Sequence, residues 1–180
     1  RRRRMKDRVA ARVPILDLEL IRFNQAERAS LRALANSSRV ADKRLCVDYL
    51  RCGEGVAANL SFILELADIL IPNRSPNVRW GLLLSIGDGF CETHPRRLWP
   101  LIARWGCHRS RDIRAAVACC VLEQVFNADF DETFARSKAL VEAGNIRFLD
   151  TLRTCWLTSK RNEAKIRRYI DQYPRRPRYR

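Results

Sequence analysis

The chain has 180 residues, of which 47% are hydrophobic and 31% charged, and this composition is typical of a folded globular protein rather than a disordered one. No apolar run approaches the roughly 18 residues needed to cross a bilayer, and the N-terminal sequence RRRRMKDRVAAR lacks the apolar core of a secretory signal. Seven cysteines are scattered without the density of a disulfide scaffold, so we expect a cytoplasmic protein that does not enter a membrane.

The formal net charge of +15 is concentrated at the two ends of the chain. Residues 1–12 carry seven basic groups against one acidic group, and residues 160–180 carry nine against two. The segment 13–159 holds 19 basic and 17 acidic groups and is nearly neutral. We therefore expect a basic N-terminal arm over 1–12, one folded domain over 13–159, and a basic C-terminal helix and tail over 160–180.

Apolar residues recur every three or four positions, whereas no stretch alternates with period two, so the sequence predicts an all-α fold without strands. Proline and glycine mark the expected helix ends, for example Pro95 in a first turn and Gly144 as a C-terminal cap. The expected helices, in chain order, span residues 15–36, 39–51, 56–71, 76–90, 95–106, 110–126, 129–143, 146–158 and 161–172.

Three segments of the chain resemble one another at a spacing of about one helix pair. They begin at Asn77, Asp112 and Asn145, with the sequences NVRWGLLLSIGDG, DIRAAVACCVLEQ and NIRFLDTLRTCWL. Each places a β-branched residue and then an arginine after its first position, and these recur at spacings of 35 and 33 residues. Another expected helix precedes each segment, so that each unit is a helix-turn-helix pair of the length found in stacked α-solenoids.

These segments resemble the second helices of HEAT-type repeats, in which an Asp or Asn, an apolar β-branched residue and an arginine open the helix. The resemblance covers residues 56–158 and implies a right-handed α-α superhelix of about four helix pairs, whose second helices line the concave side. It also implies a ladder in which each arginine pairs with an aspartate of a neighbouring turn. Asp112 fits that role, whereas Asn77 and Asn145 depart from it. The first helix of such a unit is often kinked by proline, which Pro100 matches.

The segment 110–126 contains the adjacent thiols Cys119 and Cys120, and they are interpreted either as reactive groups or as residues that pack in the core. Ser110 is the expected N-cap of this helix, and Asp112 lies in its first turn. A helix in the middle of a stack is covered on both sides and must be apolar over most of its surface. On a regular helix the two thiols point about 100° apart, so we interpret both as core residues rather than as a reactive pair.

Metal and catalytic chemistry find little support in the sequence. The most metal-like residues are two Cys and His pairs, Cys91 with His94 and Cys107 with His108. Their spacing matches no established zinc pattern, so we expect no metal and no cofactor. Neither histidine sits in a setting typical of nucleophilic catalysis, and we name no catalytic residue. The glycines of 86–90 are expected to end a helix or to let a neighbour pack closely.

Tryptophan and basic side chains supply the candidate binding residues. Trp80 and Trp156 belong to expected second helices, near the expected groove, whereas Trp99 lies among apolar neighbours and is expected in the core. Arginines between positions 96 and 114 form the densest basic set of the central segment. The candidate partner-binding residues are Trp80, Arg96, Arg97, Arg104, Arg109, Arg111, Trp156, Lys160, Arg161, Lys165, Arg167 and Arg168.

Two classes of function remain open from the sequence. In the first, which we predict, the protein is a non-enzymatic scaffold whose concave face binds a protein partner, with basic ends that add affinity for an acidic one. In the second, lysine and arginine side chains neutralise nucleic-acid phosphates. VRWG at 78–81 and the AVACC segment are also similar to HEAT-like alkylation-repair DNA glycosylases. That similarity implies that a tryptophan and an acid in the concave cleft contact a cationic damaged base. The two candidate pairs are Trp80 with Asp88 and Trp156 with Asp150.

Overall fold

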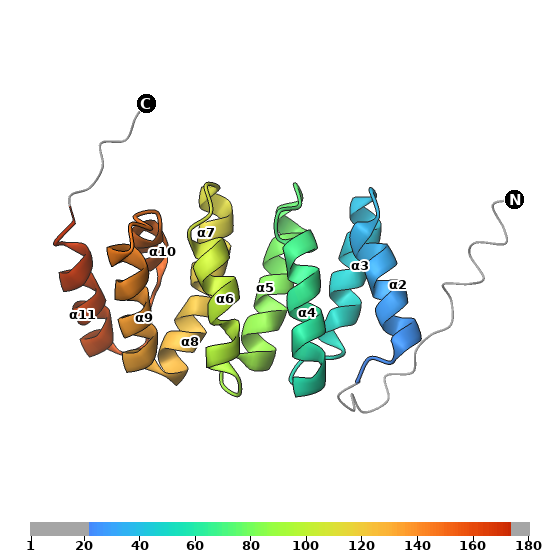
Figure 1. Ribbon diagram of the computed structural model, residues 1–180, viewed down its shortest axis with the longest axis horizontal. Helices are drawn as coiled ribbons and strands as arrows, with labels where there is room; N and C mark the ends of the chain where they lie inside the picture. The colour runs from blue at the N-terminus through green and yellow to red at the C-terminus, as the bar shows by residue number, and fades with distance from the viewer. Residues whose placement is uncertain (1–21, 174–180) are drawn as a thin grey trace, which may run out of the picture.

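Figure 1 shows the computed structural model, in which residues 22–173 are described. Every regular element among these residues is a helix, so the all-α prediction is confirmed for this part of the chain, which contains no strand. None of the helices within 22–173 is both long enough and apolar enough to cross a membrane. The expected N-terminal arm over 1–12 and the end of the C-terminal tail lie outside the described residues.

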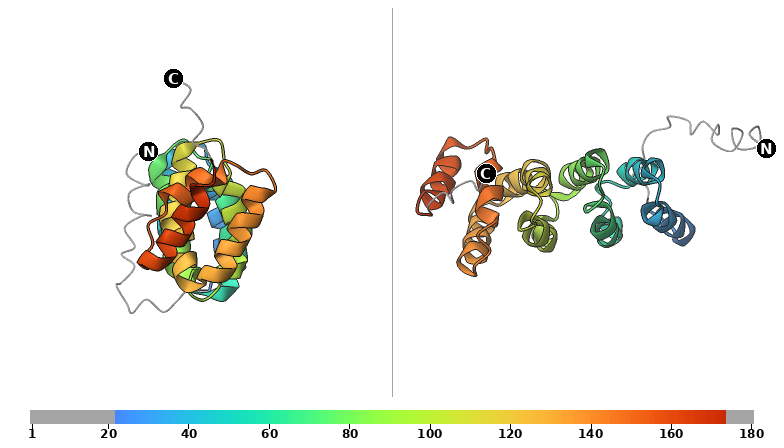
Figure 2. Two further views of the ribbon diagram at one scale, coloured as in Figure 1. Left: turned by 90° about the vertical axis from the view of Figure 1, so that its left-hand side faces the viewer. Right: turned by 90° about the horizontal axis from the view of Figure 1, so that it is seen from above.

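The helices form antiparallel pairs that follow one another in a row (Figure 1). The first helices of the pairs are α2 (Gln25–Asn36), α4 (Ala57–Leu70), α6 (Pro95–Gly106) and α9 (Phe130–Glu142). The second helices are α3 (Val40–Arg51), α5 (Pro76–Phe90), the continuous run of α7 (Arg111–Val117), the π-helix η1 (Ala118–Leu122) and α8 (Glu123–Ala128), and α10 (Phe148–Thr154). The last helix is α11 (Lys160–Ile170). The view from above in Figure 2 places the first helices in one layer and the second helices in another.

The connections between helices fall on two opposite long edges of the row (Figure 1). The turns within pairs lie along the edge that is uppermost in Figure 1, which we call the turn edge; they comprise residues 37–39, 71–75, 107–110 and 143–147. The connections that follow each pair lie along the other edge, which we call the linker edge; they comprise residues 52–56, 91–94, 129 and 155–159.

A continuous hydrophobic core fills the space between the two layers. In α4, Leu60, Ile63 and Leu66 repeat at three-residue spacing and are completely buried (0% exposed). Burial of such a side chain stabilises the fold by about 1.5–3 kcal/mol. Tyr169 and Ile170 of α11 are also buried, so this helix extends the core at the C-terminal end of the row.

Arg79 joins its own helix pair to the next pair. This side chain is 7% exposed, and its Nε and Nη2 donate to the carbonyl oxygens of Ile71 (3.1 Å) and Asn73 (2.8 Å) in the turn of its own pair. Its Nη1 donates to Oδ2 of Asp112 at the start of the following second helix. The role expected for Asp112 in an arginine–aspartate ladder is therefore confirmed.

Arg114 repeats this arrangement one pair further along. It is 8% exposed, its Nη1 donates to the carbonyl oxygens of His108 (2.7 Å) and Arg109 (3.0 Å), and its Nη2 donates to Asp150 (3.1 Å). The first two predicted copies thus have equivalent arginines. Arg147, expected to be the third, is exposed and belongs to the turn before α10, so that equivalence does not hold.

Two predicted helix boundaries are wrong, the first because of a local cap and the second because of a contact between residues far apart in the sequence. The helix expected over 15–36 begins at Gln25 in the described residues, because Asn24 caps it: Asn24 Oδ1 accepts from Glu27 N (3.0 Å) and Glu27 accepts from Asn24 N (2.8 Å). The helix expected over 146–158 ends at Thr154. Beyond it, the N–H of Trp156 donates to the carboxylate of Glu123 (2.7 Å) instead of continuing the helix.

Gly87 permits direct backbone contact between α5 and η1. A Cβ atom at this position would lie 1.9 Å from the carbonyl oxygen of Cys120. Of the two roles predicted for the glycines of 86–90, close packing is the one confirmed here, since α5 continues to Phe90.

Cys120 is buried, but Cys119 is only half-buried, so the core interpretation holds fully for one of the two thiols. They lie on a π-helix, where adjacent side chains are less than 100° apart because more residues complete each turn.

Candidate functional site

The predicted binding residues lie in four separate parts of the structure, one of which is the 155–159 connection that contains Trp156. Trp80, Arg109 and Arg111 lie at or near the turn edge. The α6 arginines belong to the layer of first helices, and the basic residues after position 160 belong to α11. The structure therefore does not bring the whole predicted set together.

The α6 arginines are occupied by contacts between successive first helices. Each forms a hydrogen bond or ion pair with a side chain of α4 or α9. The pairs are Arg96 with Glu132 (2.7 Å), Arg97 with Ser61 (2.8 Å) and Arg104 with Asp68 (2.7 Å). Such exposed contacts contribute at most about 1 kcal/mol each, but they reduce the positive charge offered to a partner on this layer.

The basic residues of α11 are also partly paired. Arg167 donates to Glu163 from both Nε (3.0 Å) and Nη2 (2.6 Å), and this contact lowers the pKa of the Glu163 carboxyl group. Lys160 lies 3.5 Å from the same carboxylate, and Lys165 lies 3.8 Å from that of Asp131. Arg161 and Arg168 are exposed and have no ion-pair partner among the described residues.

The two tryptophans proposed for the groove differ in their surroundings. Trp80 is half-buried and its indole N–H donates to Asp112 Oδ1 (3.1 Å). Trp156 is 73% exposed and follows α10 rather than lying on it. Its backbone is held by Glu123, whose pKa is raised by burial and lowered less by the hydrogen bond from Trp156. Trp99 is half-buried, and its ring packs edge-on against Phe148.

A regular row of exposed arginines follows the turn edge, of which only Arg109 and Arg111 were predicted from the sequence as binding residues. Every turn within a pair contains one: Arg39, Arg74, Arg109 and Arg147, at spacings of 35, 35 and 38 residues. Arg111, the first residue of α7, adds a fifth. Their side chains make no hydrogen bond or ion pair with other described residues. The connections of the linker edge contain no lysine or arginine at all.

The carboxylates near the turn edge leave most of this charge uncompensated. Asp42 accepts from the Ser37 hydroxyl (2.6 Å), and Asp112 and Asp150 are the acceptors of the buried arginine ladder. Glu142, the last residue of α9, is one exposed carboxylate at this edge. The edge therefore keeps a net positive charge along its length.

Nucleophilic chemistry is not supported by the buried cysteines. Burial raises the pKa of the Cys46 thiol to about 11 and that of Cys91 and Cys120 to about 12, so these thiols are protonated at neutral pH. Within residues 22–173, no three His, Cys, Asp or Glu side chains gather in a way that could hold a metal ion. Asp88 and Asp150, expected as acids beside tryptophan, accept instead from Gln124 and from Arg114 and Arg153, respectively.

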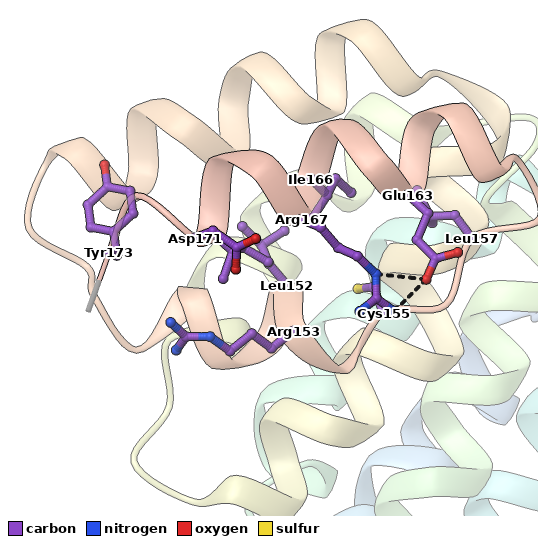
Figure 3. Close-up of a pocket in the computed structure, with 10 residues that line it drawn as sticks. Leu152, Arg153, Cys155, Leu157, Glu163, Ile166, Arg167, Asp171 and Tyr173 are labelled. Carbon is purple, nitrogen blue, oxygen red and sulfur yellow. Dashed lines mark hydrogen bonds and ion pairs between the residues drawn. The ribbon is translucent and has the colours of Figure 1, made fainter. Parts of the chain in front are cut away.

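Figure 3 shows a cavity of about 310 Å³ at the C-terminal end of the row. Its apolar lining comes from α10, the 155–159 segment and α11, with Leu152, Leu157 and Ile166 among its members. Arg167 at its rim is paired with Glu163, so the two charges compensate each other. The lining also includes Arg153 and Asp171, so the cavity combines apolar and charged side chains without a cluster of groups suited to catalysis among the described residues.

Comparison with known proteins gives no match to a family model, to a curated protein or to a solved structure. The turn edge is consequently interpreted from its own residues.

Proposed function

We propose that this protein is a non-enzymatic, HEAT-like repeat protein that binds the phosphate backbone of a nucleic acid along its turn edge. The single observation that carries the proposal is the recurrence, in each of the four turns within pairs of residues 22–173, of one exposed arginine whose side chain has no partner among the described residues. We infer a right-handed α-α superhelix as the architecture that repeats the turn at regular intervals. The protein partner favoured by the sequence alone becomes the second candidate.

The spacing of the arginines suits an extended polyanion. Packed helices lie about 8–10 Å apart, so four successive turns cover about 30 Å. A DNA duplex of that length contains about nine base pairs and presents phosphates along the whole distance. Guanidinium groups bind phosphate oxygens in a bidentate geometry, which makes arginine well suited to this contact.

The composition of the turns favours binding to a nucleic-acid duplex through contacts with its phosphate backbone. The turns at 37–39, 71–75, 107–110 and 143–147 contain no phenylalanine, tyrosine or tryptophan. Proteins that bind single strands use such rings as stacking platforms for the bases, whereas phosphate contacts alone carry no sequence information. We therefore expect sequence-independent binding to duplex nucleic acid.

The proposal is tested by fluorescence anisotropy with a labelled duplex of about 20 base pairs at about 50 mM salt. The turn-edge variant replaces Arg39, Arg74, Arg109 and Arg147 with glutamine. The linker-edge variant, which loses the same charge, replaces with glutamine four basic residues at the helix ends that adjoin the linker edge: Arg22 before α2, Arg51 at the end of α3, and Lys160 and Arg161 at the start of α11. Both retain the basic residues of 1–12 and of 165–180.

We expect the turn-edge variant to bind the duplex about a hundredfold more weakly than the wild-type protein. The linker-edge variant should retain most of the affinity, because its substitutions lie on the opposite edge. Equal losses in both variants would mean that binding follows net charge alone. A wild-type protein that fails to bind duplex at low salt would refute the proposal.

A protein partner for the layer of second helices is favoured by a separate observation. Trp156, Leu45 and Leu84 are 73%, 56% and 40% exposed on or beside these helices. Exposed apolar residues of this size are typical of protein contacts when they are contiguous. This candidate is preferred if neither duplex nor single-stranded nucleic acid binds.

A further inference from the structure

The turn between α6 and α7, residues 107–110, differs from the other turns because it holds a histidine among the arginines. His108 is half-buried and packs against Trp105, with ring centroids 5.5 Å apart. Its Nδ1 lies 3.0 Å from the backbone nitrogen of Ser110 and accepts its N–H. The neutral ring therefore carries its own proton on Nε2.

Positive charges from four segments of the structure act on His108. Burial is the largest cause that lowers the pKa of His108, and the charges of Arg109, Arg114, Arg79 and Arg147 lower it further. These arginines come from its own turn, from α7, from α5 and from the next turn along the edge.

The other charged and titratable groups of this region do not supply a free anion. Cys107 has a pKa raised by burial and is neutral at physiological pH. Asp112 and Asp150 face the same elements, but each is already an acceptor of the arginine ladder. Arg111 adds a further exposed positive charge at the start of α7.

The side chain of Arg114 contains a buried hydrogen-bond donor without an acceptor among the described residues. The Nε of Arg114 is buried and has no hydrogen-bond partner among the described residues, although both terminal nitrogens of this side chain are bonded. Buried donors without partners are rare in native structures. The region therefore contains more cationic donors than acceptors.

We propose that this turn is a proton-linked phosphate seat, in which one phosphate of a bound nucleic acid lies between Arg109, Arg111 and Arg147 while His108 takes up a proton from solvent. This inference rests on the proposed function. Burial lowers the pKa of His108 most, and the negative charge of the phosphate offsets the repulsion by which the arginines lower it further. The added proton occupies Nδ1 and displaces the Ser110 N–H, which then donates to a phosphate oxygen.

The sign of the pH dependence follows from linkage. Because the charged imidazole is favoured in the complex, the pKa of His108 is higher in the complex than in the free protein. Affinity therefore increases as the pH falls through the interval between these two values, and is constant above the higher one. A rise of one pKa unit on binding corresponds to a tenfold gain in affinity.

The chain offers an internal control for this experiment, because His94 and His108 are its only histidines. His94 belongs to the linker edge, and its Nδ1 lies 2.8 Å from the Thr93 hydroxyl. The imidazole C2 proton of each histidine is followed by NMR as a function of pH, with and without the 20-base-pair duplex. The His94→Gln variant assigns the two signals.

We expect the duplex to raise the pKa of His108 by about one unit and to leave that of His94 unchanged. The His108→Gln variant should lose the tenfold gain in duplex affinity at acid pH but keep the affinity of the wild-type protein at neutral pH. The Arg147→Gln variant should reduce the rise at His108, whereas Arg39→Gln, at the far end of the edge, should preserve it.

The two proposals fail in different ways. Duplex binding with an unchanged titration of His108, or with equal shifts at both histidines, would overturn the phosphate seat and leave the turn edge as the binding surface. Absence of duplex binding would overturn the proposed function itself.

Discussion

Replacing Gly87 with alanine tests whether α5 and η1 touch through their backbones, as the stack requires. The new Cβ would lie 1.9 Å from the carbonyl oxygen of Cys120, whereas ordinary contacts begin at 3.4 Å, so the two segments must separate by about 1.5 Å. Overpacking against a rigid backbone costs about 1–3 kcal/mol, and more when nothing can yield. Alanine recovers about 1 kcal/mol through its higher helix propensity. We therefore expect a net loss of about 2 kcal/mol in the free energy of unfolding.

The matched control is Gly81→Ala in the same helix. There the Cβ would lie 3.2 Å from Cγ1 of Val47, the end of a side chain that can adjust, so the gain in helix propensity should offset the contact. Urea denaturation followed by circular dichroism compares both variants with the wild-type protein. If Gly87→Ala were as stable as Gly81→Ala, the close contact between α5 and η1 would be wrong.

Two further substitutions test the charged contacts of the stack. Asp112→Asn removes the charge that accepts from buried Arg79 and from the ring of Trp80, so we expect about 2 kcal/mol of destabilisation in urea; an unchanged midpoint would contradict the ladder. Glu123→Gln keeps an acceptor for Trp156 N–H but removes a carboxylate whose pKa is raised by burial. A raised carboxyl pKa means that ionisation destabilises the fold above that pKa. The variant should therefore be at least as stable as the wild-type protein at pH 7, by less than about 1 kcal/mol; the difference should shrink as the pH falls through the raised pKa of Glu123 and vanish below the ordinary pKa of a glutamate, and a less stable variant at pH 7 would refute this.

The helical pairing was accessible from the sequence because apolar periodicity and helix-end residues are local signals. Ser110 caps its helix, and Gly144 adopts a φ of 94° just after α9, as their positions indicated. The capping box of Asn24 and Glu27 was equally readable and would have corrected the start of α2. The end of α10 was not readable, because it depends on the contact between Trp156 and Glu123, 33 residues apart.

The first helix pair shows why the repeat was only partly visible. Lys43 there donates to the carbonyl oxygen of Ala35, eight residues earlier, as Arg79 does to that of Ile71. A lysine in place of the arginine conceals this equivalence in the sequence. Arg39, Arg74 and Arg147 were not predicted as binding residues for a related reason: each is isolated from the basic set of 96–114 along the chain, and the turn arginines become neighbours only when the pairs stack.

The most direct test of the central claim is the salt dependence of duplex binding for the wild-type, turn-edge and linker-edge proteins. Each phosphate contact contributes about −0.9 to the slope of log affinity against log salt concentration. Five contacts by the turn-edge arginines therefore contribute about −4.5, and the four arginines replaced in the turn-edge variant account for about −3.6 of this. If the turn arginines bind phosphates, the turn-edge variant should have a slope shallower than that of the wild-type protein by about 3.6, and the linker-edge variant should keep the slope of the wild-type protein. Equal slopes for the wild-type and turn-edge proteins would contradict it.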